Sequence, residues 1–244
     1  MGCGGIEHSA VLVSFRTADD LNEVTREWGA VRAEEFAAAD PWRIFRWYLG
    51  QRHYSGTYWS STVGSSVIYE SRLELARLLF ADFAPTVRHI VAQPFLLRAT
   101  VDQESRKHIP DYFLMTDAGP VIMDVKPARR LADPKVAFTF AWTREIVEAR
   151  GWRYEVATEP PAIELTNVRF LSGYRRGWLF AADLLAQLRA RKLHGATLDD
   201  PFSCLPTEPD ELVRSAVLHL LWRQELTIDL SKPLNRRTEL RSMA

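Results

Sequence analysis

The chain has 244 residues, of which 47% are hydrophobic and 25% charged, a composition typical of a folded globular protein. This length allows one large domain, or a catalytic domain with a small accessory one. The 31 basic residues balance the 31 acidic ones. A formal net charge of zero excludes a protein that coats nucleic acid by bulk charge alone. It does not exclude a local basic patch that acidic residues elsewhere in the chain balance.

Cysteine content and the first residues predict a cytoplasmic protein. The two cysteines, Cys3 and Cys204, are too few for a disulfide framework or a zinc knuckle. The start, MGCGGIEHSA, lacks the basic region and the apolar core of a secretory signal. No apolar run approaches the roughly 18 residues of a membrane span. We therefore expect a protein of the reducing cytosol without a membrane partner.

The first sixty residues are interpreted as an N-terminal extension, 1–60. They contain a predicted helix over 33–46 and then an aromatic, turn-rich stretch, GQRHYSGTYWSSTVG. Apolar spacing predicts an amphipathic helix over 67–81. Strand-length apolar runs, each bounded by Pro, Asp or Gly, follow at 87–91, 95–101, 108–115 and 120–127.

A second helix is predicted from Asp133, the expected N-cap, and Pro134, the first helical position, through about Arg150. The next strand-like run, WRYEVAT, covers 152–158. The order helix, strands, helix, strand predicts an α/β fold in which helices flank a mixed sheet.

After Pro160 and Pro161 the pattern becomes mostly helical, and we place a domain boundary between Glu159 and Asn167. Helical patterns precede a β-like tail, ELTIDLSKPL. This order predicts a small winged-helix-like domain over 163–244, a shape that binds DNA or protein. The helical patterns cover 167–174, 178–192 and 210–225.

The residues that suggest chemistry lie in two neighbouring strand-like runs. In VIMDVK, Asp124 and Lys126 alternate onto one face of a strand. If residues 117–118 form a two-residue hairpin loop, Asp111 lies directly opposite Asp124. Two carboxylates about 5 Å apart at Cβ repel each other, and a divalent cation would compensate them. A three-residue loop would instead turn Asp111 to the other face, so the prediction depends on this register.

Glu74, on the predicted helix over 67–81, would complete a set of three carboxylates around Mg²⁺, for which Mn²⁺ would substitute. Glu70, one turn earlier, competes with it for this role. Arg77, three residues later, would instead make Glu74 part of an ordinary surface ion pair. Lys126 would orient or deprotonate a water molecule, or stabilise the charge of a pentacovalent phosphate.

Basic residues flank the acidic pattern, as a phosphodiester substrate requires, because phosphate contacts position a nucleic-acid strand. These candidate DNA-binding residues are Arg106 and Lys107 before the hairpin and Arg129 and Arg130 after it. For the six histidines, which lack metal-ligand spacing, a structural or exposed position is the favoured interpretation, and a DNA contact by His108 is the less favoured alternative. Neither a Gly-rich phosphate loop nor a G-x-S-x-G nucleophile elbow is present.

Four blocks of the sequence resemble the TnsA family, the endonuclease subunits of heteromeric cut-and-paste transposases in bacteria, within the PD-(D/E)xK nuclease superfamily. The resemblance runs from about Gln51 to Tyr174 in the family's order. It implies a restriction-endonuclease-like nuclease core over 61–162. The four blocks are GQRHYSGTYWSSTVG, YESRLELARLLFADFAPTVRHIVAQPFLL, IPDYFL and VIMDVKP.

The resemblance implies a catalytic role for three residues, Glu74, Asp111 and Lys126. The prototype of the family has Gln two positions before the lysine, whereas this chain has Asp124, which matches the acid-x-Lys pattern of the wider superfamily. By the same analogy, the backbone carbonyl of Val125 would be a further metal ligand.

The resemblance also implies a function and partners. The chain would hydrolyse a phosphodiester of double-stranded DNA at the 5′ ends of a transposon, while a DDE-type transposase cuts the 3′ ends. An AAA+ ATPase regulator would contact the C-terminal domain, and the protein would be nucleoid-associated when active. Gln93, in VAQPF, matches a recurrent glutamine of the family and joins the DNA-binding candidates.

Two alternatives stay open. One is a free-standing restriction- or repair-type nuclease of the same superfamily. The other is a non-catalytic assembly subunit that bridges transposase and ATPase, which the intact set of Glu74, Asp111, Asp124 and Lys126 argues against.

Overall fold

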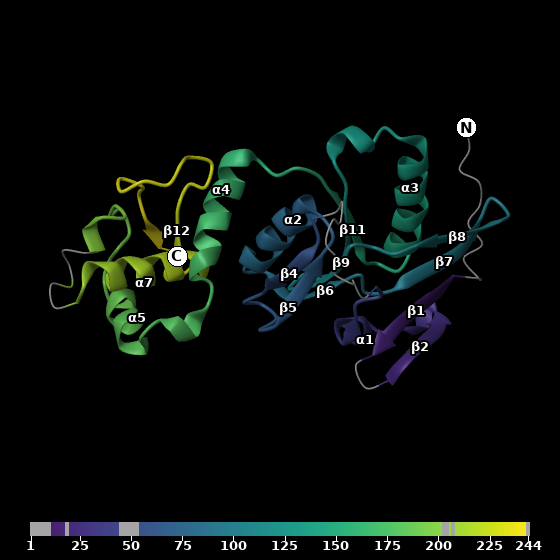
Figure 1. The fold of residues 1–244 in the computed structure, drawn as a ribbon, viewed down its shortest axis with the longest axis horizontal. Coiled ribbons are helices and arrows are strands. Elements are labelled where there is room, and N and C mark those ends of the chain that lie inside the picture. Colours follow the sequence, from purple (N-terminus) through teal and green to yellow (C-terminus); the bar gives the residue numbers. More distant parts are fainter. Residues whose placement is uncertain (1–10, 18–19, 44–53, 202–204, 206–207, 243–244) are drawn as a thin grey trace. The chain divides into compact units, whose positions relative to one another are not determined.

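The computed structural model describes residues 11–17, 20–43, 54–201, 205 and 208–242 (Figure 1). The chain divides into two compact units: unit 1 comprises Met1–Asp82 and Thr86–Glu159, and unit 2 comprises Phe83–Pro85 and Pro160–Ala244. The architecture is mixed α/β, with mostly antiparallel strands and flanking helices. None of the described helices is both long and apolar enough to cross a membrane.

The first sheet of unit 1 has the strand order β2-β1-β7-β8, with β3 paired to β1. The sequence pattern predicted neither β1 nor β2, yet the pairing of β1 with β7 makes this segment part of the sheet that carries β7 and β8. Val13 and Phe15 alternate into the core from β1. The strands are β1 (Leu12–Thr17), β2 (Asp20–Glu27), β3 (Ala39–Asp40), β7 (Leu96–Val101) and β8 (Glu104–His108).

The helix predicted over 33–46 is much shorter where it is described. Helix α1 covers only Ala33–Ala37, and the chain then turns into β3. Asp40 precedes Pro41, whose ring disfavours a helical residue before it, so the helix has a local reason to end. Residues 44–46 lie outside the described residues, as do 50–53 of the aromatic stretch and both cysteines.

The second sheet of unit 1 has the strand order β11-β10-β9-β6. Strands β9 and β10 pair antiparallel from Thr116↔Gly119 to Tyr112↔Met123, which confirms the register of the two-residue loop. Gly119, at φ 104°, adopts a backbone conformation that side chains disfavour. Strand β11 pairs with β10 in parallel. The bounds are β6 (Val87–Ala92), β9 (Tyr112–Thr116), β10 (Gly119–Val125) and β11 (Arg153–Ala157).

The strand predicted over 108–115 is in fact two strands in two sheets. His108 ends β8 in the first sheet, and Tyr112 begins β9 in the second. Pro110, which has no backbone N–H to donate to a ladder, lies in the crossing between them. This crossing brings the end of the first sheet next to the start of β9.

The helix predicted over 67–81 was wrong at its start. Val67 belongs to β5 (Ser66–Tyr69), which pairs with β4 (Gly56–Trp59), and α2 covers Arg72–Phe83. The prediction for the second helix is confirmed. Helix α3 covers Pro134–Glu148, and the side chain of Asp133 accepts a hydrogen bond from the N–H of Lys135 at its N-terminus.

Asp82, near the end of α2, is 5% exposed and anchors the loop after β4. Its Oδ1 accepts hydrogen bonds from the Ser60 hydroxyl at 2.6 Å and the Thr62 N–H at 2.8 Å. Its Oδ2 accepts them from the Tyr58 hydroxyl at 2.7 Å and the Ser61 N–H at 3.1 Å. Both carboxylate oxygens are therefore satisfied by protein donors, and the stretch GTYWSST that the sequence presented as aromatic and turn-rich is built around this aspartate.

Unit 2 is mostly helical, as predicted. The helix expected over 178–192 begins only at Ala182, because Trp178 lies in a separate 3₁₀ turn. Only Leu226–Thr227 of the predicted β-like tail forms a strand, β12, which pairs with β13 (Arg241–Ser242). The helical segments that lie wholly within the described residues are α4 (Ala162–Leu171), η4 (Ser172–Tyr174), η5 (Gly177–Leu179), α5 (Ala182–Arg189) and α7 (Asp210–Trp222).

Candidate functional site

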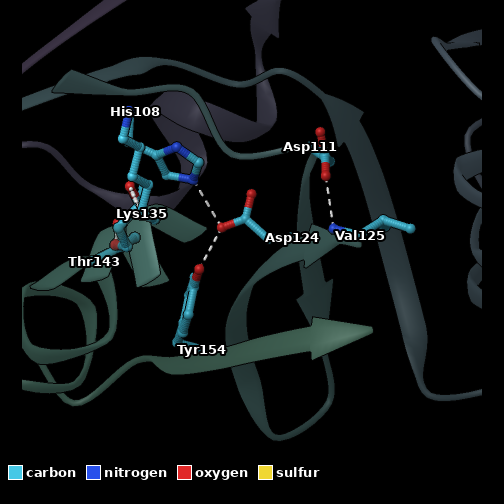
Figure 2. Close-up of polar contacts among 8 residues, drawn as sticks. His108, Asp111, Asp124, Val125, Lys135, Thr143 and Tyr154 are labelled. Carbon is cyan, nitrogen blue, oxygen red and sulfur yellow. Dashed lines mark hydrogen bonds and ion pairs between the residues drawn. The ribbon is translucent and has the colours of Figure 1, made fainter. Parts of the chain in front are cut away.

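Asp111 lies directly before β9, one residue beyond the last pair of the β9–β10 ladder. Its Oδ2 accepts a hydrogen bond from the N–H of Val125 at 2.6 Å (Figure 2). Its backbone carbonyl accepts one from the N–H of Gln93 at 2.8 Å. The confirmed register and these two bonds place the Asp111 carboxylate at the end of β10, beside the segment that carries Asp124 and Lys126.

Gln93 has a structural role that the sequence did not reveal. It is 6% exposed and has a left-handed backbone conformation, φ 47°. Its side-chain amide donates to the Glu70 carboxylate, its Oε1 accepts from the Arg43 N–H at 3.2 Å, and its carbonyl accepts from the Trp42 N–H at 2.9 Å. Each polar atom of Gln93 thus has a protein partner. Its backbone N–H supports Asp111 by donating to the Asp111 carbonyl. Its predicted contact with DNA stays a prediction.

Asp124 is 2% exposed, and two side chains hydrogen-bond to the same oxygen. Its Oδ2 accepts a bond from the Tyr154 hydroxyl and lies 2.8 Å from Nε2 of His108 (Figure 2). The three residues come from β10, β11 and β8 respectively. Within the described residues, no hydrogen bond reaches Oδ1 of Asp124 or Oδ1 of Asp111.

Sequence reasoning missed Tyr154 altogether and favoured a structural or exposed position for His108. The parallel pairing opposes Asp124 to Val156 and Ile122 to Tyr154, so Tyr154 shares a sheet face with Asp124. The alternation in WRYEVAT was visible, but its register against β10 was not. No local signal connects His108 to Asp124, because they belong to different sheets.

The carboxylates of the site lie close enough together to raise the pKa of Asp111. Burial raises the pKa of Asp111 well above its usual value, and the nearby carboxylates of Asp124 and Glu74 raise it further. The pKa of Glu74 is also raised, again first by burial. The Lys126 ammonium opposes both pKa shifts, so it lies close enough to interact with Asp111 and Glu74. This is the like-charge arrangement that a cation would relieve.

Glu74 caps its own helix. Its Oε1 accepts a hydrogen bond from the Ser71 hydroxyl at 2.8 Å, and its Oε2 accepts one from the Glu70 N–H at 2.6 Å. The ion pair with Arg77 that the sequence allowed is replaced by a hydrogen bond from Arg77 to the Thr158 carbonyl at 2.5 Å. Both oxygens of Glu74 are thus engaged at the start of α2, and its role as a metal ligand stays a prediction.

The remaining donors suit magnesium. Among the described residues, no group of three or more His, Cys, Asp or Glu side chains is arranged to hold a metal ion. Mg²⁺, however, is usually held by one or two carboxylates, with water and substrate phosphates as its other ligands. Oδ1 of Asp111 and Oδ1 of Asp124 are hard oxygen donors of this kind. The donor set therefore fits Mg²⁺, with the Val125 carbonyl and Glu74 as further predicted ligands.

The four basic candidates differ in how far they are available to a ligand. Arg106 is engaged with the protein: its guanidinium lies 2.5 Å from the Glu104 carboxylate and 5.2 Å from the Phe138 ring centroid. Its Nε is buried and lacks a hydrogen-bond partner within the described part of the chain. Lys107, Arg129 and Arg130 are exposed, and Arg130 also pairs with Asp133 at 3.2 Å. The exposed three are the better candidates for phosphate contacts.

Comparison of the chain with protein-family models and with curated proteins finds no match in either.

Proposed function

We propose that this chain is a Mg²⁺-dependent DNA endonuclease that acts as a subunit of a heteromeric cut-and-paste transposase and hydrolyses a phosphodiester at the 5′ ends of the transposon. One observation carries the proposal. Asp111, Asp124 and Lys126 lie together at adjoining strand ends, in the register that the motif requires. The sequence blocks that resemble TnsA supply the reaction class and the transposon context.

The fold supports the proposal at a coarse level. The second sheet of unit 1 is mixed, with β10 and β11 parallel and the other neighbours antiparallel. Both α2 and α3 belong to the same unit. A restriction-endonuclease-like core is part of the proposal, as is a winged-helix-like shape for unit 2.

Each residue of the site would have a distinct task. Asp111 and Asp124 would hold Mg²⁺, and Glu74 would join them by leaving its helix cap. The bound ion would polarise the scissile phosphodiester and lower the pKa of water. Lys126 would orient the attacking water and stabilise the negative charge that develops on the phosphate. Because phosphate contacts position the strand, Lys107, Arg129 and Arg130 would hold the backbone on either side.

Net charge supports a nuclease that a partner brings to its substrate. With 31 basic and 31 acidic residues, the whole chain has little bulk attraction for DNA. Double-stranded transposon ends are the proposed substrate, and a DDE-type transposase that cuts the 3′ ends is the proposed partner. An AAA+ ATPase regulator would bind unit 2, and the protein would act at the bacterial nucleoid.

The test is cleavage of transposon-end DNA with Mg²⁺ and the partner transposase. We expect Asp111→Ala and Lys126→Ala each to lower the rate of 5′-strand cleavage at least about 100-fold, because the first removes a ligand of the ion and the second removes a positive charge that stabilises the reacting phosphate. Matched controls are Asp117→Ala in the same hairpin and Lys135→Ala in α3, both exposed, which should cut like wild type.

Three results would contradict the proposal in different ways. If Asp111→Ala and Lys126→Ala cut like wild type, the site is wrong. Cleavage of arbitrary DNA by the isolated chain would favour the free-standing nuclease. A complex that assembles and cuts only 3′ ends would favour the non-catalytic assembly subunit.

A further inference from the structure

Two side chains outside the predicted site approach Asp124 from the same side. His108 is the last residue of β8, and Tyr154 is the second residue of β11. Both bond to Oδ2 of Asp124, and in Figure 2 the two dashed lines end on this one oxygen while none reaches the other. One oxygen of the carboxylate is therefore held by the protein, and the other is left without a protein donor among the described residues.

Helix α3 in turn fixes the two donors. The ring of His108 lies against Phe140 and Trp142, with centroids 6.3 and 6.2 Å away. Arg144 lies over the ring of Tyr154 at 5.0 Å and donates a hydrogen bond to its carbonyl at 3.0 Å. The side chain of His108 is only 15% exposed. Packing on α3 thus restricts the positions of both donors, and through them the orientation of Asp124.

Folding alone does not explain this arrangement. Ile122, two residues earlier on the same face of β10, packs in the hydrophobic core. An apolar residue at position 124 would continue that face, whereas a buried carboxylate is destabilising unless it is fully hydrogen-bonded. Asp82 shows how this chain satisfies a structural aspartate, with protein donors on both oxygens. Oδ1 of Asp124 has no protein donor among the described residues and is not one of their fully buried atoms, so it is accessible to a ligand.

We propose that His108 and Tyr154 are positioning residues that hold Asp124 by Oδ2, so that its Oδ1 faces the same cation as Oδ1 of Asp111. This inference rests on the proposed function, because it assigns Asp124 to the metal site. Groups that hydrogen-bond to a ligating carboxylate orient it, and their loss typically lowers metal affinity or activity about 10- to 100-fold. His108 and Tyr154 act through Asp124 and do not touch the DNA.

The main experiment measures binding of Mn²⁺ alone to the DNA-free protein, by electron paramagnetic resonance of the free ion. Tyr154→Phe removes the hydroxyl and keeps the ring that packs under Arg144. We expect this variant to bind Mn²⁺ about 10- to 100-fold more weakly than wild type. In the cleavage assay the half-saturating Mg²⁺ concentration should rise by a similar factor, with the rate at saturating Mg²⁺ and the KM for DNA nearly unchanged.

Two pairs of variants distinguish positioning from a general structural effect. His108→Leu should weaken Mn²⁺ binding like Tyr154→Phe, and His108→Gln, whose amide places a donor near Nε2, should restore it. Tyr58→Phe removes a comparable Tyr–Asp bond, at Asp82, and should lower the melting temperature with no change in Mn²⁺ affinity. Because His108→Leu leaves a buried acceptor with one donor fewer, Tyr154→Phe decides the outcome if His108→Leu does not fold.

Several results would overturn the inference. Unchanged Mn²⁺ affinity in folded Tyr154→Phe would do so, whatever the cleavage rate, and so would wild-type protein that binds no Mn²⁺. A protein that binds Mn²⁺ through Asp124 and loses affinity in Tyr154→Phe, yet cuts no DNA, would instead support the positioning role and contradict the proposed function.

Discussion

Among the described residues of unit 1, the buried Asp82 differs from the pair formed by the buried Asp124 and the half-buried Asp111 in how fully the protein satisfies its carboxylate. Asp82 accepts hydrogen bonds on both oxygens from the loop after β4. Asp111 and Asp124 each accept protein donors on Oδ2, and they lie close enough to raise the pKa of Asp111 beyond the effect of burial. The difference separates an aspartate that stabilises a loop from a pair that is arranged for a ligand.

The two kinds of aspartate should also affect the stability of the fold differently. A fully hydrogen-bonded carboxylate can be buried without a large penalty, whereas neighbouring carboxylates that share a buried site repel each other. Natural proteins commonly accept such strain at functional sites, so that substitutions there often increase stability and abolish activity. Opposite effects on stability are therefore expected when the two kinds of aspartate are changed.

The largest expected effect on stability is at Asp82. Asp82→Ala would remove the acceptor of several buried donors, and we expect the free energy of unfolding to fall by at least about 3 kcal/mol, since each unsatisfied group is destabilising by roughly 1–3 kcal/mol. Urea denaturation followed by circular dichroism measures this change. The exposed Asp117, which pairs with Arg88 at 2.6 Å, is the control, and Asp117→Ala should change stability by no more than about 1 kcal/mol. An unchanged urea midpoint for Asp82→Ala would contradict the role of Asp82 in stabilising the loop after β4.

A smaller effect of opposite sign is expected at Asp111. Asp111→Asn removes a charge that the site repels, while its amide oxygen can still accept from the Val125 N–H. We expect thermal denaturation in EDTA at neutral pH to show a gain of about 1 kcal/mol, together with loss of cleavage. The matched control is Asp82→Asn, the same chemical change, which should destabilise the protein. Loss of stability in both variants would show that the two aspartates are equivalent.

The sign of the pH dependence at Asp111 follows from the direction of its pKa shift. Because its folded-state pKa is raised above 3.8, the folded state holds the proton more tightly than the unfolded chain. The contribution of Asp111 to wild-type stability is therefore fully present below about 3.8 and is lost as the pH rises through the raised pKa. The advantage of Asp111→Asn should be present at neutral pH and disappear in acid.

The smallest effect extends the comparison to unit 2, where His219 is 4% exposed. Its Nδ1 lies 2.7 Å from the Tyr174 carbonyl and its ring stacks on Phe180 at 4.4 Å. Burial lowers the pKa of His219 from 6.5, so the neutral form is favoured in the folded state, and stability is lost as the pH falls from about 6.5 through the lowered pKa. His219→Asn keeps a donor for Tyr174 and should reduce this acid-induced loss, as measured by urea denaturation on both sides of that pH. The control, His194→Asn at an exposed position, should leave the acid-induced loss unchanged. Equal pH profiles for wild type and His219→Asn would contradict the role of His219 in this loss.

Local patterns predicted the parts of the site that depend on neighbouring residues. The two-residue loop was one of the two registers that the sequence allowed, and the structure confirms it. Together with the hydrogen bond from the Val125 N–H, this register places Asp111 at the end of β10. The N-cap at Asp133 and the alternation of VIMDVK were also visible in the sequence. Strand β1 was missed because its partner β7 is about eighty residues away and its own alternation is too short to stand out. Strand β2, which pairs with β1, was missed with it.

The sequence by itself indicated which residues carry the proposed chemistry, because alternation along a strand is a local property, and it left the hairpin register open between a two-residue and a three-residue loop. The structure decided for the two-residue loop. Only the tertiary structure decided how those residues are supported. Gln93 behind Asp111, and His108 and Tyr154 on Asp124, are contacts between segments distant in the chain, and no spacing encodes them. The tertiary structure also set the pKa of Asp111, because burial and the neighbouring carboxylates, which the fold brings together, raise it.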